Sequence, residues 1–204
     1  DISSHYVDGD VCWGRGLSFH ITPSNVAATA LYSWAFALLT GNPSIVRISS
    51  SVSSYLQPVF VLLDSVYPRY SNLLPLFCFI GYPRNSQTTS VLSLFSDIRL
   101  IWGGDSTVTS IKSVPSKPAC VDIPFPDRKS FIVLDTSLFP ESYTQLKADI
   151  DDLAKDIVLY SQLACSSPII IYLPQSLSFE SIEFKKFISC LAESITSSKF
   201  LDFT

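Results

Sequence analysis

The stretch Phe19-His20-Ile21-Thr22-Pro23-Ser24-Asn25-Val26 decides the fold class, because an apolar strand ends there in a turn that opens a helix. Hydrophobic residues over 17–22 predict the strand, and the long apolar run that follows predicts a helix over 26–40. Ser24 or Asn25 is the expected cap of this helix, since both residue types satisfy the free amides of a helix start. A strand that passes directly into a helix is typical of an α/β fold.

The same alternation of strand and helix continues over the first 123 residues. The other predicted strands cover 44–48, 76–80, 98–102 and 119–123, and the other predicted helices cover 52–66, 88–95 and 106–112. Strands separated by helices of this length favour a parallel sheet that is covered on both faces. We therefore expect a Rossmann-like, mostly parallel sheet with helices on both faces, and we interpret residues 1–123 as a nucleotide-binding domain.

A proline-rich segment flanks the last of these strands on both sides and marks the expected domain boundary. It contains Pro115, Pro118, Pro124 and Pro126. Beyond it, the pattern predicts strands over 131–134 and 169–173, and helices over about 141–164 and 179–194. Residues 124–204 are therefore expected to begin a second α/β domain that the chain does not complete.

The composition narrows the classes of partner. The chain has 204 residues, of which 47% are hydrophobic and 16% charged, and its net charge of −4 argues against a nucleic-acid partner. Its longest apolar run is too short to span a bilayer. Five widely spaced cysteines and two histidines show no zinc-ligand spacing, so we expect no metal and free thiols in a reducing cytoplasm. The chain lacks methionine and starts at Asp1, which indicates a fragment of a longer protein.

Ligands of parallel sheets bind beyond the carboxyl ends of the strands, and three predicted strands end in residues suited to a cofactor. A cation after a buried strand could meet a ribose hydroxyl or a phosphate, and two glycines before a helix allow a phosphate to approach the backbone. The alternative interpretation of the cation is an ordinary surface charge, and the alternative interpretation of the two glycines is a plain tight turn. The candidate cofactor-binding residues are Thr22, Pro23, Ser24, Arg47, Ser50, Gly103 and Gly104.

Cys165 is the candidate nucleophile, because it lies in a turn between a long helix and an apolar strand, where a thiol can leave the core. The alternative is a buried, inert thiol. Asn25 is the candidate donor to a developing oxyanion, although it could serve only as a helix cap. The other thiols in the expected elements, Cys78, Cys120 and Cys190, are expected to pack. His20 is expected to be a hydrogen-bonded structural histidine.

Several of these segments, taken in order, resemble the aldehyde dehydrogenase superfamily. They are Pro23-Ser24-Asn25-Val26, Gly41-Asn42-Pro43-Ser44-Ile45-Val46-Arg47, Ile101-Trp102-Gly103-Gly104-Asp105 and Cys165. Three segments are similar to one branch, the acyl-CoA (fatty acid) reductases of bacterial bioluminescence. They are Phe19-His20-Ile21-Thr22-Pro23-Ser24-Asn25-Val26, Trp102-Gly103-Gly104-Asp105 and Ala164-Cys165-Ser166-Ser167-Pro168. The resemblance runs from about Gly16 to Pro174.

The resemblance implies a thioester mechanism. Cys165 would take an acyl group from acyl-CoA or from an acyl-carrier partner protein, Asn25 would hold the oxyanion, and a nicotinamide cofactor would deliver the hydride that makes a fatty aldehyde. Phe125 stands where hydrolytic members carry a glutamate that activates water, which disfavours release of a free acid. Arg47 stands where the family usually has a lysine. Ser50 stands where the family often has an acidic residue that holds a ribose, and a small neutral residue there leaves room for a 2′-phosphate, which favours NADPH over NADH.

The resemblance also implies that residues 124–204 are the beginning of a catalytic domain and that the complete protein is an oligomer. The remainder of that domain is expected to be missing, so this fragment alone is expected to be inactive. Three alternatives stay open. They are a non-catalytic nucleotide-binding fragment, an aldehyde-oxidising dehydrogenase, and a cysteine acyltransferase or hydrolase without a redox step.

Overall fold

The computed structural model describes residues 13–66, 69, 71–84, 86–134, 143–162, 164–174 and 178–197. The side chains of residues 72–74, 143–146 and 160–161 are not part of this description. The chain folds into two units, Asp1–Pro126 and Asp127–Thr204.

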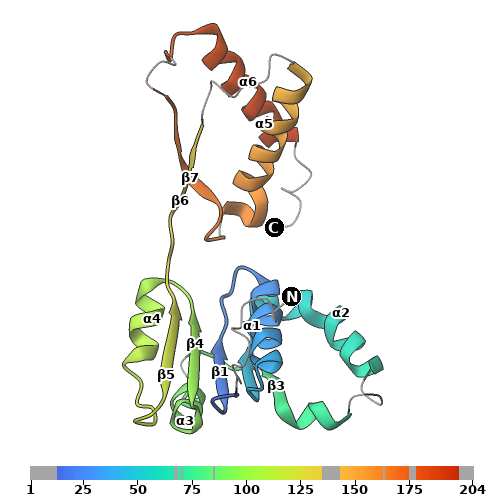
Figure 1. Ribbon diagram of the computed structural model, residues 1–204, viewed down its shortest axis with the longest axis vertical. Coiled ribbons are helices and arrows are strands. Elements are labelled where there is room, and N and C mark those ends of the chain that lie inside the picture. Colours follow the sequence, from blue (N-terminus) through green and yellow to red (C-terminus); the bar gives the residue numbers. More distant parts are fainter. Residues whose placement is uncertain are drawn as a thin grey trace, which may run out of the picture. The chain divides into compact units, whose positions relative to one another are not determined.

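The first unit is built on a five-stranded parallel sheet (Figure 1). Its strands are β1 (Ser18–Ile21), β2 (Ser44–Arg47), β3 (Phe77–Ile80), β4 (Ile98–Trp102) and β5 (Val121–Phe125), in the spatial order β3-β2-β1-β4-β5. All four strand pairs are parallel. The predicted Rossmann-like, mostly parallel sheet is therefore confirmed. Because β2 and β4 lie on opposite sides of β1, the strand order reverses at β1, which is where ligands of such sheets bind.

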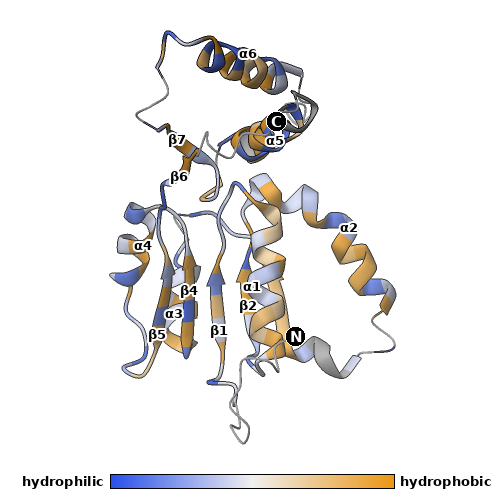
Figure 2. Ribbon diagram, turned by 45° about the horizontal axis from the view of Figure 1, so that its top comes forward, coloured by the Kyte–Doolittle hydropathy of each residue, from blue (hydrophilic) through white to orange (hydrophobic). Residues whose placement is uncertain are grey.

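Helices cover both faces of this sheet. They are α1 (Ala27–Leu39), α2 (Ser50–Val66), α3 (Thr88–Phe95) and α4 (Asp105–Lys112). On one face, Ala30 of α1 and Leu56 of α2 pack with Val46. On the other face, Val108 of α4 packs with Phe19 and other strand residues, and a residue of α3 joins this cluster. The orange segments in Figure 2 show how apolar residues concentrate in the strands and in the helix surfaces that meet them.

Some predicted boundaries were wrong. The α1 helix begins at Ala27 with Val26 at the cap position, so Ser24 and Asn25 lie outside the predicted capping role. Val26 adopts an extended backbone (φ −130°, ψ 102°), and its apolar side chain accepts no hydrogen bond. The α2 helix begins at Ser50 instead of residue 52, and β5 lies two residues later than predicted. The 3-10 helix Ser71–Leu76 was not predicted, because short helices of this kind lack a long periodic pattern.

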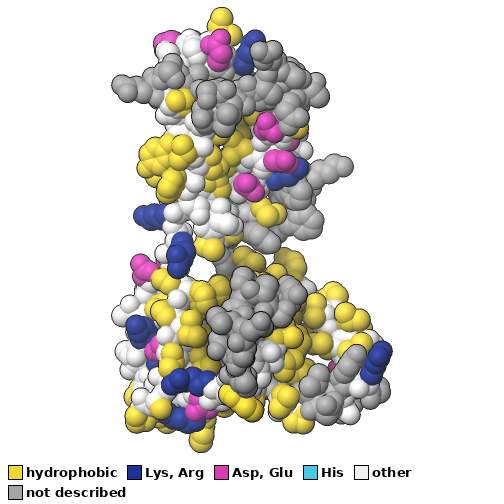
Figure 3. Space-filling model, in the orientation of Figure 1, with side chains coloured by type: hydrophobic (Ala, Val, Ile, Leu, Met, Phe, Trp, Pro, Cys, Tyr) yellow, Lys and Arg dark blue, Asp and Glu magenta, His cyan; other side chains and the backbone are white. Residues whose placement is uncertain are grey.

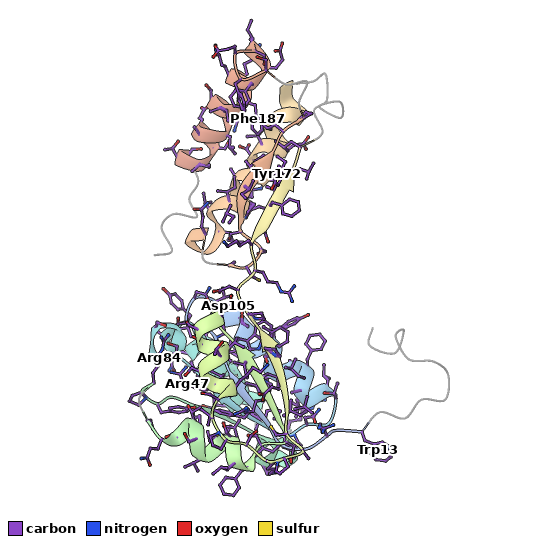
Figure 4. The ribbon with its side chains drawn as sticks, turned by 90° about the vertical axis from the view of Figure 1, so that its left-hand side faces the viewer. Trp13, Arg47, Arg84, Asp105, Tyr172 and Phe187 are labelled. Carbon is purple, nitrogen blue, oxygen red and sulfur yellow. The ribbon has the colours of Figure 1, made fainter. Side chains whose placement is uncertain are left out.

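The second unit contains a two-stranded parallel sheet and two helices. Its elements are β6 (Ser130–Val133), α5 (Tyr143–Val158), the 3-10 helix η5 (Leu159–Gln162), β7 (Pro168–Tyr172) and α6 (Ile182–Ser197). A buried cluster joins the helices, with Ile150 and Ala154 of α5 against Phe187 and Leu191 of α6. Figure 4 labels Phe187 on α6. Ile171 of β7 packs against this cluster and so connects the sheet to the helices.

Only one face of the β6–β7 sheet is covered within the described part of the unit. The opposite face carries Phe131, Val133, Ile170 and Tyr172, which are all exposed; Val133 is 69% and Tyr172 53% exposed. The rings of Phe131 and Tyr172 pack edge to face, with 5.4 Å between their centroids. Figure 3 shows hydrophobic side chains gathered on the side of this unit where β6 and β7 lie.

Candidate functional site

Three of the predicted ligand-binding segments meet at one edge of the first sheet. Ile21, the last residue of β1, pairs with Arg47 of β2 on one side and with Ile101 of β4 on the other. The segments that follow these strands therefore begin side by side. Thr22 Oγ1 donates to the carbonyl of Arg47 at 2.6 Å, and Ser51 Oγ donates to the carbonyl of Ser24 at 3.0 Å, so the first two segments are also linked by hydrogen bonds.

The residues of the turn after β1 differ in their exposure to solvent. Thr22 is buried, Pro23 is partly buried, and Ser24 and Asn25 are exposed. The Thr22 hydroxyl is occupied by the Arg47 carbonyl, which makes it a support of the turn. Ser24 and Asn25 are the residues of this turn that a ligand can reach, and the side-chain amide of Asn25 supplies a hydrogen-bond donor.

Arg47 is not the ordinary surface charge that its place at a strand end could also have indicated. It is 9% exposed, and its guanidinium carbon lies 5.2 Å from the centre of the Tyr82 ring. Its Nη2 donates to the Tyr82 carbonyl at 3.5 Å, a long contact. A guanidinium over an aromatic face is held by a cation–π attraction. Arg47 is thus fixed by the segment that follows β3.

Tyr82 and Arg84 are residues at this edge that the sequence reasoning missed. Tyr82 lies two residues beyond β3, and its hydroxyl lies 2.9 Å from Thr89 Oγ1. Burial raises the pKa of Tyr82, while the Thr89 hydrogen bond and Arg47 lower it to a smaller extent. Arg84 is exposed. In Figure 4, Arg47, Arg84 and Asp105 are labelled in the half of this unit where the strands end. The sequence feature that could have identified Tyr82 and Arg84 is their position directly after the predicted strand over 76–80.

The loop after β4 has the backbone of a close-approach turn. Gly103 has φ +156°, and a Cβ at this position would lie 3.1 Å from Cβ of Thr107, so glycine is required there. Gly104 occupies the cap position of α4. Asp105 belongs to the first turn of α4, although the predicted helix began one residue later. A carboxylate in this turn provides the negative charge that a helix N-terminus favours, so a phosphate at the same place would meet repulsion.

Ser50 is exposed and is the first residue of α2. It is a small neutral side chain at a helix N-terminus, where free backbone amides favour an anion. The Ser50 carbonyl accepts a hydrogen bond from Ser53 Oγ at 3.1 Å. The neighbouring Ser51 bonds to Ser24, which puts Ser50 and Ser24 on adjacent segments of the same edge.

Cys165 lies in a tight turn in the second unit. The turn is closed by a hydrogen bond of 3.0 Å from the Ser167 amide to the Ala164 carbonyl, and it directly precedes β7. Ser130 Oγ, from the start of β6, donates to the Cys165 carbonyl at 2.6 Å. Ser167 is buried, and its hydroxyl donates to the Leu159 carbonyl at 3.3 Å. The Cys165 side chain itself is exposed, so the turn holds the backbone on both sides while the thiol faces outward.

The prediction that the three other thiols pack was wrong for one of them. Cys190 is buried and Cys120 is intermediate, whereas Cys78 is exposed. Cys78 lies on β3, the edge strand of the sheet, between two phenylalanines that pack on the opposite face against Trp34. Strand alternation points the Cys78 side chain away from that packed face. Burial raises the pKa of the Cys120 thiol.

Asn25 belongs to the first unit and Cys165 to the second. The predicted convergence of their side chains on one carbonyl oxygen therefore stays a prediction. Among the described residues, no group of three or more His, Cys, Asp or Glu side chains could hold a metal ion. None of the helices in the described ranges is long and apolar enough to cross a membrane.

The sequence matches the family model described as acyl-CoA reductase (LuxC) over residues 10–199. It is 30% identical over 164 residues to the long-chain acyl-protein thioester reductase of Vibrio harveyi, and 26% identical to the protein of that name from Aliivibrio fischeri. Each alignment covers 78% of this chain and 32% of the relative. The chain thus spans about a third of the length of the curated relatives that it matches.

Solved structures of aldehyde dehydrogenases share the fold. The putative aldehyde dehydrogenase PutA from Anabaena variabilis superposes with a TM-score of 0.67 at 20% identity, covering 91% of this chain and 36% of that protein. A lactaldehyde dehydrogenase superposes with a TM-score of 0.69 at 17% identity, covering 92% of this chain and 36% of that protein. At these identities the similarity concerns the fold.

Proposed function

Because the chain belongs to the acyl-CoA reductase (LuxC) family, we propose that it carries the nucleophile and the cofactor-binding residues of an enzyme that reduces long-chain acyl thioesters to fatty aldehydes. The observation that carries this proposal is the exposed thiol of Cys165, in a turn whose backbone is fixed by Ser130 and Ala164. A rigid turn with an outward thiol suits covalent catalysis, since the nucleophile must reach a substrate without reorganising the core.

The acylation step uses the Cys165 sulfur. The thiolate bonds to the acyl carbon, the bond from that carbon to the donor's sulfur breaks, and the released thiol takes the proton. The donor is acyl-CoA or an acyl group on a carrier protein. We propose that the Asn25 side-chain amide and the Cys165 backbone amide donate to the oxyanion, a type of contact in which one lost donor typically costs about 2.7–4 kcal/mol of barrier.

The proposed cofactor is NADPH, which would supply the hydride that reduces the thioester and regenerates the thiol. Ser24, Arg47, Ser50, Gly103 and Gly104 are the residues proposed to contact it, and Thr22 and Pro23 are proposed to shape the turn that presents Ser24 to it. Their fit is supported by the adjacent strand ends, the glycine backbone at Gly103 and the neutral Ser50 at a helix start. Asp105 disfavours a phosphate at the α4 N-terminus, so we place the cofactor's anionic groups nearer to Arg47 and Ser50.

Acylation of Cys165 is tested with a radiolabelled acyl-CoA and the complete protein. Cys165→Ser should abolish the covalent adduct, whereas Cys78→Ser should retain it; Cys78 is a matched control because its thiol is also exposed. Asn25→Ala should slow acylation by roughly a hundredfold or more while NADPH binding is retained. An adduct that persists in Cys165→Ser would show that the mechanism is wrong.

The cofactor is tested by calorimetric titration with NADPH and NADH. Wild type should prefer NADPH, and Ser50→Asp should weaken NADPH more than NADH, because a carboxylate repels a 2′-phosphate. Arg47→Lys should weaken binding while it keeps a cation beside Tyr82. Equal affinity for the two cofactors in the wild type, or no response to Ser50→Asp, would contradict the role given to Ser50.

A cysteine acyltransferase without a redox step is the second candidate. It is favoured by two observations, the aromatic contact that occupies Arg47 and the carboxylate of Asp105 in the first turn of α4. Acylation of Cys165 without binding of NADPH or NADH would identify it. An aldehyde-oxidising dehydrogenase is less well supported, because Phe125 is stacked on Trp102 at 3.7 Å and offers no group that activates water.

A further inference from the structure

A chain of buried and partly buried hydrogen bonds runs from the end of β4 into the centre of the first sheet. Trp102 Nε1 donates to Ser33 Oγ of α1 at 3.2 Å. Ser33 Oγ lies 2.7 Å from Nδ1 of His20, which is fully buried on β1. His20 Nε2 lies 2.9 Å from Ser18 Oγ, and that hydroxyl donates to the Pro43 carbonyl at 3.0 Å.

The neighbouring hydroxyls select the arrangement of protons along this chain. Ser44 Oγ lies 2.9 Å from Ser18 Oγ and donates to the Asn42 carbonyl, so the single Ser18 proton goes to Ser44 or to the Pro43 carbonyl, and Ser18 accepts the Nε2–H of His20. The Nδ1 atom of His20 is then an acceptor, and Ser33 donates to it while accepting the indole N–H of Trp102. Burial lowers the pKa of His20 to about 4, which keeps the ring neutral, as this arrangement requires. The prediction of a hydrogen-bonded structural histidine is confirmed.

The chain of hydrogen bonds ends at the residue that starts the glycine loop. Trp102 is the last residue of β4, and its ring stacks on Phe125 with 3.7 Å between centroids. The next amide, Gly103 N–H, donates to the Phe125 carbonyl at 3.3 Å. Gly103 has a left-handed φ of +156°, so the backbone turns sharply directly after an anchored residue. The Gly103–Gly104 loop thus departs directly from a residue whose ring is held by a stack and by a hydrogen bond.

We propose that Ser33 and His20 are positioning residues, which hold the Trp102 indole and through it the Gly103–Gly104 loop at the ligand-binding edge. A stack on Phe125 alone would leave the indole free to slide, whereas a directed hydrogen bond selects one orientation. Polar groups buried in the middle of a sheet cost free energy unless each has a hydrogen-bond partner. Apolar side chains at these positions would pack without that requirement. The role in cofactor binding rests on the proposed function, whereas the role in holding the loop does not.

The test uses two variants and one matched control. Ser33→Ala removes the hydroxyl between Trp102 and His20, and Trp102→Phe keeps a ring over Phe125 but removes the indole donor. Ser96→Ala is the control, because Ser96 is also buried and its hydroxyl donates to a helix carbonyl (Leu92, 2.6 Å) outside this network. All three variants should lose some stability, so stability alone does not decide the question.

The first measurement is amide hydrogen exchange by NMR, expressed as the rate at Gly103 divided by the rate at Val46 in the sheet centre. This ratio should rise by about tenfold or more in Ser33→Ala and Trp102→Phe, as expected for the loss of roughly 1.4 kcal/mol of local protection, and it should stay within about twofold in Ser96→Ala. An unchanged ratio in Ser33→Ala, or an equal rise in Ser96→Ala, overturns the inference.

The second measurement is the Kd for NADPH by calorimetry. It should rise by about tenfold in Ser33→Ala and Trp102→Phe and remain unchanged in folded Ser96→Ala. If wild type binds no nicotinamide cofactor while the Gly103 exchange ratio responds as expected, the proposed function fails and the positioning role stands. If NADPH binds with equal affinity to wild type and Ser33→Ala, the proposed role of this network in cofactor binding is wrong, and the exchange ratio alone decides its role in holding the loop.

Discussion

The parallel sheets of the two units differ in how many of their faces are covered by helices. In the first unit, five strands lie between helices on both faces, and every residue of β1 is buried. In the second unit, two strands rest on α5 and α6 with one face, while Phe131, Val133 and Tyr172 on the other face are exposed. Parallel sheets are normally covered on both faces. The first unit thus has a complete core, and the described part of the second has half of one.

The difference between the two units shows that the apolar pattern of a strand does not by itself decide how deeply its residues are buried. The strands of both units have similar apolar composition, yet an isoleucine of β4 (Ile101) is fully buried and one of β7 (Ile170) is 46% exposed. The decisive factor is the number of layers that surround the strand. Substitutions should therefore have effects that follow the layer in which a residue lies and not its hydrophobicity.

The largest effect is expected from Phe187→Ala, which removes the centre of the α5–α6 cluster. Truncation of a buried phenylalanine typically costs about 3–5 kcal/mol. All three tryptophans (Trp13, Trp34 and Trp102) precede residue 127, so tryptophan fluorescence reports on the first unit alone. Under urea, Phe187→Ala should shift the circular dichroism transition and leave the fluorescence transition in place. Leu56→Ala should shift the fluorescence transition, and identical shifts in both signals for both variants would contradict the separation of the cores.

Asp122→Ala should have the next largest effect. Arg99 is 2% exposed and forms a two-pronged ion pair with Asp122 across β4 and β5, with N–O distances of 2.7 and 2.8 Å. Removal of the carboxylate leaves a buried cation without its partner, which costs about 3 kcal/mol. Fluorescence-detected unfolding should report this loss. Lys117→Ala is the control in the same unit, because the Lys117–Asp97 pair is more exposed and its removal should shift the same transition clearly less.

The free energy of unfolding of the first unit should depend on pH, and this effect should be of intermediate size. Burial lowers the pKa of His20 from 6.5 to about 4, so between these values the unfolded chain binds a proton that the folded chain excludes. Stability should therefore be complete above about pH 6.5 and fall as the solution is acidified, by about 2 kcal/mol at pH 5. Urea unfolding followed by fluorescence from pH 7.5 to 5 measures this loss. A His20→Gln protein that keeps the same slope would assign the pH dependence to another group.

The smallest effect is expected from Val133→Thr on the open face of the second unit. The side chain is 69% exposed, so the free energy of unfolding should change by less than about 0.5 kcal/mol. Ile171→Thr on the covered face should cost about 2 kcal/mol, because it removes apolar contacts and buries a hydroxyl. Circular dichroism of urea unfolding compares the two variants. A loss of more than about 1 kcal/mol in Val133→Thr would show that this face is covered in the protein.

Much of the fold followed from local pattern. The helix over 88–95 and the strand over 98–102 have the predicted bounds, because each is a short apolar segment with clear polar ends. The start of α1 was predicted one residue too early, because Val26 keeps an extended backbone that its apolar character did not reveal. Tyr82 escaped prediction because its contact with Arg47 joins residues 35 positions apart.

The sequence determined which segments are strands and helices, their parallel arrangement and the turns that carry Asn25, Gly103 and Cys165, because these depend on periodicity and turn chemistry within a few residues. The tertiary structure decided which polar groups are occupied and which face outward. Arg47 is held against Tyr82, His20 is neutral within a serine network, and Cys78 and Cys165 are exposed. Burial and hydrogen bonding depend on residues that are distant in the chain, and only the packed layers bring those residues together.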